Sequence, residues 1–172
     1  MKTVLKFAGV ISLVAGIVAI ILFMTTPGVN YTASSQLIGG STSTSFAGQT
    51  LIFGGENIAI NWAGLGIFIA LVCGLVLLFC GFILPIANVK AAKKFAGLIN
   101  FLAACCLIAA GVFAFFIIPA FTAVNGSASF DWGTLAKGEY SITFTWIIAA
   151  IVSIAGGVFA LLPTVANLSS KK

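Results

Sequence analysis

The sequence contains no histidine and no arginine, and only three of its 172 residues are acidic. Histidine is the side chain best suited to acid–base chemistry near neutral pH and is the commonest metal ligand. No motif surrounds Glu56, Asp131 or Glu139, so the sequence offers no nucleophile with a base, no acid–base pair and no set of metal ligands. We therefore predict a protein that is not an enzyme and that has no catalytic residue, metal or cofactor.

Charge of either sign is scarce, and this excludes a soluble domain. Charged residues make up 6% of the chain and hydrophobic residues 61%, with a mean hydropathy of +1.23. A soluble protein of this composition could not cover its surface with polar groups. The net charge of +5 comes from lysines that lie at the ends of apolar runs, without a basic face. We therefore expect the lipid bilayer as a partner, and no nucleic acid.

Cysteine is present but in the wrong places for a disulfide framework. Cys73, Cys80, Cys105 and Cys106 all lie inside apolar runs, and none lies in a polar loop. Small packing residues are the plain interpretation of these side chains. Palmitoylation of Cys80, which lies near the end of its run, is the alternative.

Four apolar runs are long enough to cross a bilayer as helices, which takes about 20 residues. The basic start of the chain also fits a signal peptide, but the first run is long for one and lacks a small-residue cleavage site. Pro27 and Pro119 are predicted to end the first and third spans. The predicted spans are residues 4–25, 62–87, 95–119 and 142–166, joined by outer loops at 26–61 and 120–141.

The lysines predict the orientation of these spans. The N-terminus, the turn after the second span and the C-terminus hold seven of the eight lysines, and Lys137 is the exception. The positive-inside rule then places both termini in the cytoplasm, so we predict a multi-pass protein of the cell membrane. Trp62, Trp132, Trp146 and Tyr140 fall on the outer side. They are interpreted as an aromatic belt, with a binding role as the alternative.

A thirteen-residue pattern occurs twice, as TLIFGGENIAINW at Thr50–Trp62 and as TLAKGEYSITFTW at Thr134–Trp146. Five positions are identical without a gap, whereas unrelated sequences of this bias should share roughly one or two. We infer a tandem duplication, with repeats at 1–89 and 90–172. Because each repeat crosses the membrane twice, the halves should be related by an axis along the membrane normal. Trp62 and Trp146 should then lie at equal depth.

Parts of the outer loops alternate like strands. Thr50–Phe53, Ile58–Trp62 and Ile142–Trp146 carry β-forming residues, the last two at period two. We predict that they join strands from Gln36–Phe53 in a small antiparallel sheet, with a flexible Ser/Thr/Gly loop as the alternative. The predicted inner face of this sheet caps the helices and consists of Ile58, Ile60, Ile142 and Phe144.

The second and fourth spans carry small residues four apart, which lets helices pack closely. Ion-coupled transport usually leaves an ionisable group inside the membrane, and none of the four predicted spans has one away from its ends. The fold class is therefore an all-α, four-transmembrane-helix bundle made of two repeats, with a small extracytoplasmic β element. The predicted helix-packing positions are Gly66, Ala70 and Gly74, followed by Ala149, Ser153 and Gly157.

Four spans, cytoplasmic ends and a long first outer loop with strand character resemble the claudin-type tetraspan arrangement. The resemblance is one of topology, because residues 28–61 lack the tryptophan and cysteines of the claudin first loop, so it implies no site residues.

We expect a structural or interaction role, as an accessory subunit or tetraspan-like protein that contacts another membrane protein or a second copy. The alternative is a channel or transporter for a small or apolar solute. Candidate contact residues are Trp62, Trp146, Trp132, Tyr140, Glu56 and Glu139, together with the small-residue helix faces.

Overall fold

Four long helices dominate the computed structural model, which describes residues 2–35, 39–86, 90–126, 130–131, 133 and 136–169. Each is long and apolar enough to cross a membrane, so the chain is a multi-pass membrane protein with four candidate spans, as predicted. Trp132 lies outside the described residues. The helices are α1 (Lys2–Thr25), α3 (Trp62–Ile86), α4 (Lys90–Phe115) and α6 (Phe144–Ser169).

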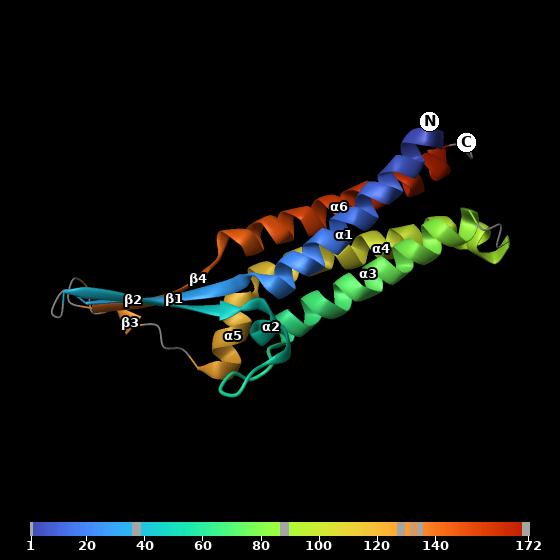
Figure 1. Ribbon diagram of the computed structural model, residues 1–172. Coiled ribbons are helices and arrows are strands. Elements are labelled where there is room, and N and C mark those ends of the chain that lie inside the picture. Colours follow the sequence, from blue (N-terminus) through green and yellow to red (C-terminus); the bar gives the residue numbers. More distant parts are fainter. Residues whose placement is uncertain are drawn as a thin grey trace.

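The long helices pack side by side as a bundle (Figure 1). α3 packs along α4, α4 along α6 and α6 along α1, while α1 touches α3 over a shorter length. The start of α1, the end of α3, the start of α4 and the end of α6 lie together at one end, here called the lysine end (Figure 1). A β-sheet projects from the opposite end, here called the sheet end.

Leu107 of α4 fills the middle of the bundle. It is fully buried, and three glycines on three other helices make room for it. Methyl groups added at Gly16, Gly74 and Gly156 would lie 3.4, 3.2 and 3.6 Å from its side-chain carbons. A branched side chain set against three glycine surfaces gives dense packing, so at this level the bundle is filled by protein.

Two buried serines join the helices by hydrogen bonds. The Ser12 hydroxyl on α1 donates to the carbonyl of Gly156 on α6 at 2.6 Å. The Ser153 hydroxyl on α6 donates to the carbonyl of Leu107 on α4 at 2.7 Å. Each hydroxyl therefore has a partner although it is shielded from solvent and lipid.

Four of the six small-residue positions predicted for helix packing, Gly66, Gly74, Ser153 and Gly157, contact α4. Ala149, Ser153 and Gly157 are all buried on α6, and the Gly157 backbone approaches the Ala104 carbonyl. On α3, Gly74 is buried, while Gly66 and Ala70 are half-buried. Gly66 and Gly74 lie against side chains of α4, including Phe113 and Leu107. Both stripes are therefore occupied within the chain.

The third span ends earlier than predicted. α4 stops at Phe115, and after the break at Phe116 the short helix α5 (Ile117–Asn125) turns across the sheet end (Figure 1). Pro119 has no backbone N–H, and its ring would clash with the carbonyl of Phe115, four residues earlier. The span was predicted to end at about residue 119, and the helix stops four residues earlier because proline breaks a helix upstream of itself.

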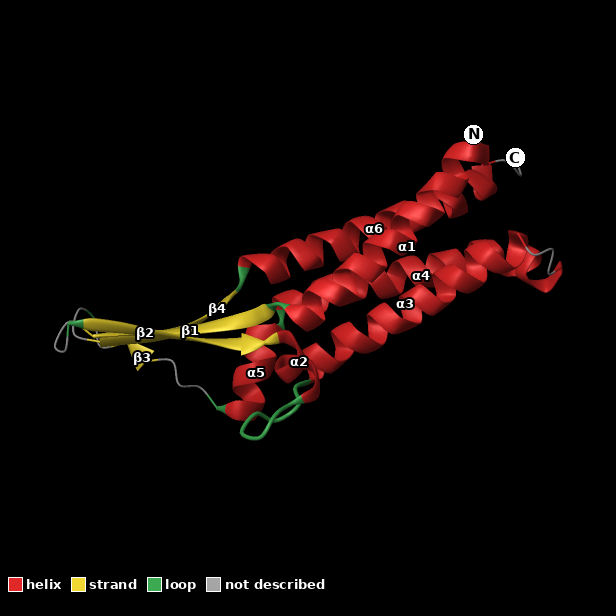
Figure 2. Ribbon diagram, in the orientation of Figure 1, coloured by secondary structure: helices red, strands yellow, loops and turns green. Residues whose placement is uncertain are grey.

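Both loops contribute to one antiparallel sheet, as predicted (Figure 2). Its strand order is β2-β1-β4-β3, so the first and second loops meet where β1 pairs with β4. The first loop supplies β1 (Pro27–Ser35) and β2 (Gly40–Ala47), and the second supplies β3 (Phe130–Asp131) and β4 (Ala136–Ile142). β1 directly follows α1 and begins earlier than the predicted Gln36.

The segment Thr50–Phe53 is a helix and not the predicted strand. It belongs to α2 (Gly48–Phe53), which ends at Gly54 with a φ of 81°. Leu51 and Ile52 are both buried, an arrangement that a strand with one covered face cannot give to consecutive residues. The Gly48 N–H donates to the Thr26 carbonyl at 3.0 Å, which ties α2 to the end of α1.

The predicted strands Ile58–Trp62 and Ile142–Trp146 were also wrong. Ile58 makes only an isolated bridge to Gly55, and α3 begins at Trp62. In the second segment β4 ends at Ile142, because the Thr143 carbonyl accepts the N–H groups of Trp146 and Ile147 and so begins α6.

Because these strands do not form, the predicted inner face of the sheet was also wrong. Ile60 is 54% exposed and Phe144 is 75% exposed, so neither side chain caps the bundle. Ile58 and Ile142 do pack against the core, as half-buried residues. A period of two over five residues was too short to distinguish a strand from a loop that leads into a helix.

Candidate functional site

The register of the sheet gives it two different faces. Residues paired across antiparallel strands share a face, and neighbours along a strand alternate. Thr32 of β1 pairs with Ser43 of β2 and with Glu139 of β4. The side chains on this side are all hydroxyl, amide or charged groups, and we call it the polar face. It consists of Asn30, Thr32, Ser34, Ser41, Ser43, Ser45, Asp131, Lys137, Glu139 and Ser141.

The opposite face is aromatic and is covered near the bundle. Tyr31 and Tyr140 pair across β1 and β4 with ring centroids 4.9 Å apart. Phe121 of α5 packs against this face, with its ring centroid 5.6 Å from that of Tyr140 and 5.1 Å from that of Phe46 of β2. Tyr140, a predicted contact residue, is therefore half-buried and packs against Tyr31, Phe46 and Phe121.

Beyond this aromatic cluster, the same face holds a small open cavity of about 220 Å³ at the far end of the sheet. Its walls are mostly small residues of this face and the ring of Phe130, with Ser34 of the polar face at its margin and no charged group among them. They are Ala33, Ser34, Ser35, Gly40, Thr42, Phe130 and Ala136.

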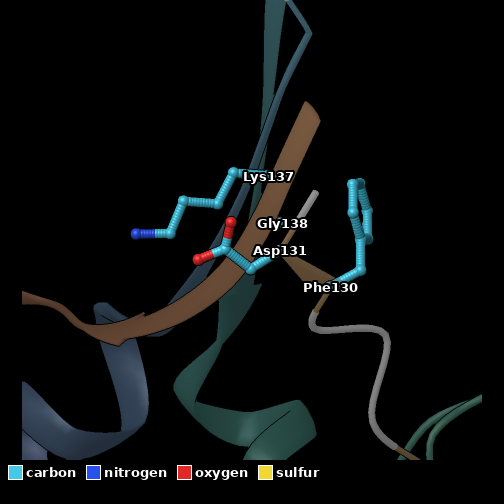
Figure 3. Close-up of a pocket in the computed structure, with 4 residues that line it drawn as sticks. All are labelled: Phe130, Asp131, Lys137 and Gly138. Carbon is cyan, nitrogen blue, oxygen red and sulfur yellow. The ribbon is translucent and has the colours of Figure 1, made fainter. Parts of the chain in front are cut away.

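The charged groups of the sheet gather on β3 and β4 (Figure 3). The Lys137 ammonium lies 3.1 Å from a carboxylate oxygen of Glu139, and both side chains are at least half exposed. Asp131 is the β3 partner of Lys137 and points to the same side, while Phe130 points to the other (Figure 3). The hydrogen bond to Glu139, followed by the charges of Glu139 and Asp131, raises the pKa of Lys137.

The two glutamates suggested by the sequence lie on different elements. Glu139 is on β4 in the ion pair with Lys137, whereas Glu56 is exposed in the loop between α2 and α3. Within the part of the chain that the structure describes, no three His, Cys, Asp or Glu side chains gather where a metal ion could be held. The charged side chains therefore lie on an exposed surface and do not converge on a common site.

The two tryptophans of the repeated pattern occupy different environments. Trp146 is fully buried, and its ring meets Phe23 edge to face at a centroid distance of 5.0 Å. Its Nε1 has no hydrogen-bond partner among the described residues. Trp62 is 54% exposed and meets Phe113 and Phe116 at 6.2 and 6.4 Å. Trp62 is thus available to lipid or a partner, whereas Trp146 is a core residue.

Asn61 is an important residue that sequence reasoning missed. It is fully buried, and its Oδ1 accepts the Gly64 N–H at 2.8 Å, which caps the start of α3. Its Nδ2 donates to the Leu51 carbonyl at 2.7 Å, which fixes α2 against α3. An asparagine directly before a long apolar run is an N-cap signal, and it could have predicted this role.

Asn125 acts in a similar way at the end of α5. Its Oδ1 accepts the Ala59 N–H at 2.7 Å, and its Nδ2 donates to the Ala59 carbonyl at 3.3 Å. The loop before α3 is thereby attached to the second half of the chain. No sequence pattern indicated this contact, because the two residues are 66 positions apart.

The sheet end therefore combines a rigid support with an exposed polar surface. α2, α5 and the loop before α3 cover α3 and α4, while β1 and β4 extend from α1 and α6 (Figure 1). This arrangement is suited to making contacts. No known protein family matches the chain, and no curated protein is similar to it in sequence.

Proposed function

We propose that this protein is a non-enzymatic membrane protein that acts by contact, as an accessory or tetraspan-like component that binds another membrane protein or a second copy of itself. The polar face of the sheet is the observation that carries this proposal. It projects beyond the bundle, and its β1 and β4 members are exposed except for the half-buried Asn30. A rigid surface rich in hydroxyl groups can exchange hydrogen bonds with water for hydrogen bonds with a partner.

The interior of the bundle supports an interaction role over a solute path. Leu107 fills the middle against three glycines, and the small-residue stripes of α3 and α6 are used against α4. Contacts with a partner are then left to the sheet end and to the lipid-facing surface. The small-residue faces that were predicted for partner binding are therefore used mainly for packing within the chain.

The proposal places the polar face outside the cell. Lys2, Lys6, Lys90, Lys93 and Lys94 belong to the lysine end, and the sheet lies at the opposite end. The positive-inside rule then places the lysine end in the cytoplasm of a cell-membrane protein.

Thiol labelling tests this orientation. The four native cysteines are replaced, and a single cysteine is introduced by Ser43→Cys or by Ala91→Cys. A membrane-impermeant thiol reagent on intact cells should label position 43, and should label position 91 only after permeabilisation. Labelling of 91 in intact cells would reverse the orientation and remove the sheet from the cell surface.

Site-specific photocrosslinking tests the contact role itself. A photoreactive amino acid is placed at Thr32 on the polar face, and in a matched control at Phe101, which is exposed on α4 in the bundle. We expect crosslinks to protein from position 32 and mainly to lipid from position 101. If position 32 crosslinks to no protein in cells at native expression, the proposed function is wrong.

A further inference from the structure

The two edges of the sheet are protected to very different degrees. β3 is a two-residue strand, and the charges of Asp131 and Lys137 lie beside it. β2 forms the other edge with eight residues, Gly40–Ala47, all exposed except Phe46. Its sequence, GSTSTSFA, contains no charged residue and no proline.

An unprotected edge of this kind is a pairing site. About half of the backbone N–H and C=O groups of an edge strand point outward without a strand to bind them. Proteins normally block such edges with charge, proline, a bulge or short length. The β3 edge uses short length and charge. Within β2 itself the register with β1 is regular from Gly40 to Phe46, so β2 has none of these protections.

The direction of β2 limits which copy of the chain could pair with it. The strands continue away from the bundle roughly along its long axis, so they point away from the bilayer (Figure 2). Two copies in one membrane are related by an axis along the membrane normal, which is nearly parallel to β2. Rotation about such an axis does not change the distance of any atom from the membrane. Each N–H would then face an N–H and each C=O would face a C=O.

Antiparallel pairing of two β2 strands instead needs a two-fold axis perpendicular to the sheet. That axis lies parallel to the membrane, so the second copy projects in the opposite direction. It must therefore come from a facing membrane. The absence of charge on β2 means that two identical edges meet without repulsion.

We propose that β2 pairs with β2 of a second copy in an apposed membrane, which makes one continuous eight-stranded sheet. This inference rests on the proposed contact function and names its partner. Because the axis preserves the two faces, polar-face residues meet polar-face residues. In the centred register Ser43 lies opposite Ser43, and Ser41 lies opposite Ser45.

Vesicle tethering tests the pairing with the full chain. The purified protein is reconstituted into two sets of liposomes with different fluorescent lipids, and their association is measured. We expect the wild-type chain to tether the two sets. Ser43→Lys should abolish tethering, because it places like charges opposite each other across the new pair. Ser141→Lys is the matched control, since it adds the same charge to the same face on an interior strand, and it should tether normally.

Charge-reversal rescue separates specific pairing from damage to the fold. Ser43→Lys liposomes mixed with Ser43→Glu liposomes should tether again, while each variant mixed with itself should not. Lack of rescue, or equal loss with Ser141→Lys, overturns the proposed pairing. If wild-type liposomes do not tether while position 32 still crosslinks to protein in cells, the contact function stands and a second copy in a facing membrane is the wrong partner.

Discussion

The segments Thr50–Trp62 and Thr134–Trp146 share five of thirteen residues, yet they build different structures. The first forms α2 and an irregular loop, whereas the second contributes β4 and the first turn of α6. The difference lies in the positions that are not shared. Lys137, Glu139 and Ser141 alternate with the half-buried Tyr140, which suits a strand with one solvent-exposed and one covered face.

The corresponding part of the first segment, Thr50–Gly55, has no such alternation. Leu51, Ile52 and Phe53 are consecutive apolar residues, and a short helix can bury the first two together while Phe53 contacts Phe68. The comparison teaches that matching landmarks, such as the tryptophans, do not ensure matching structure. The predicted repeats at 1–89 and 90–172 stay a prediction about the origin of the chain. Four mutational comparisons test how the two segments differ.

Truncation of the tryptophans should give the largest difference. Trp146→Ala removes a fully buried ring from between Phe23 and the start of β1, and it should destabilise the fold by about 3–5 kcal/mol. Trp62→Ala removes a half-exposed ring and should cost roughly 1 kcal/mol. Denaturant unfolding in detergent micelles, followed by circular dichroism, measures both. Equal losses would mean that the two tryptophans are equivalent after all.

The residue before each tryptophan gives the next difference. Asn61→Ala removes the cap of α3 and leaves the buried Leu51 carbonyl without its donor, so it should cost about 2 kcal/mol. The matching Thr145→Ala loses two exposed contacts, one with the Thr143 hydroxyl at 3.2 Å and a longer one to the Pro27 carbonyl at 3.5 Å. A change within about 0.5 kcal/mol is expected. The same unfolding measurement applies. A larger loss for Thr145→Ala would contradict the assigned roles.

The paired positions Ile60 and Phe144 should matter little for stability. Both side chains are largely exposed, so the double variant Ile60→Ala, Phe144→Ala should lose no more than about 1 kcal/mol. A loss of several kcal/mol would restore the inner face predicted from alternation, because buried large-to-alanine changes cost about 2–5 kcal/mol each.

The ion pair of the second segment should give the smallest effect. Glu139 and Asp131 raise the pKa of Lys137 above its ordinary 10.5. A lysine whose pKa is raised in the folded state stabilises the fold at pH values below its unfolded-state pKa. That contribution is lost as the pH rises through its folded-state pKa. Because the pair is exposed, Lys137→Met should have the same melting temperature as the wild type. The difference between the two should also stay the same from neutral to mildly alkaline pH, which lies below the pKa of Lys137. A pH-dependent melting temperature in this range would contradict this description.

The sequence was sufficient to predict the four spans, because twenty apolar residues have few alternatives to a membrane helix. It also predicted that both loops contribute to one sheet. It did not locate the ends of elements. The break at Phe116 arises from Pro119 three residues later, and the helical Thr50–Phe53 depends on contacts with α1 and α3.

The candidate surface was predicted less well than the fold. Trp146 and Tyr140 were selected as aromatic residues near the outer interface, but tertiary contacts bury the first and cover the second. The polar face was not recognised because its residues come from four strands in two loops. Only the pairing of β1 with β4 brings them together, and one sequence carries no direct signal of that register.

The join between helices and sheet has a mechanical consequence. β1 follows α1 after one residue, β4 precedes α6 after one residue, and the two strands pair side by side over seven residues. A pulling force on the tip of the sheet acts along the length of strands that are anchored in the bilayer. Hydrogen bonds perpendicular to that force bear the load together and do not open one after another. The sheet end is therefore built to resist stretching away from the membrane.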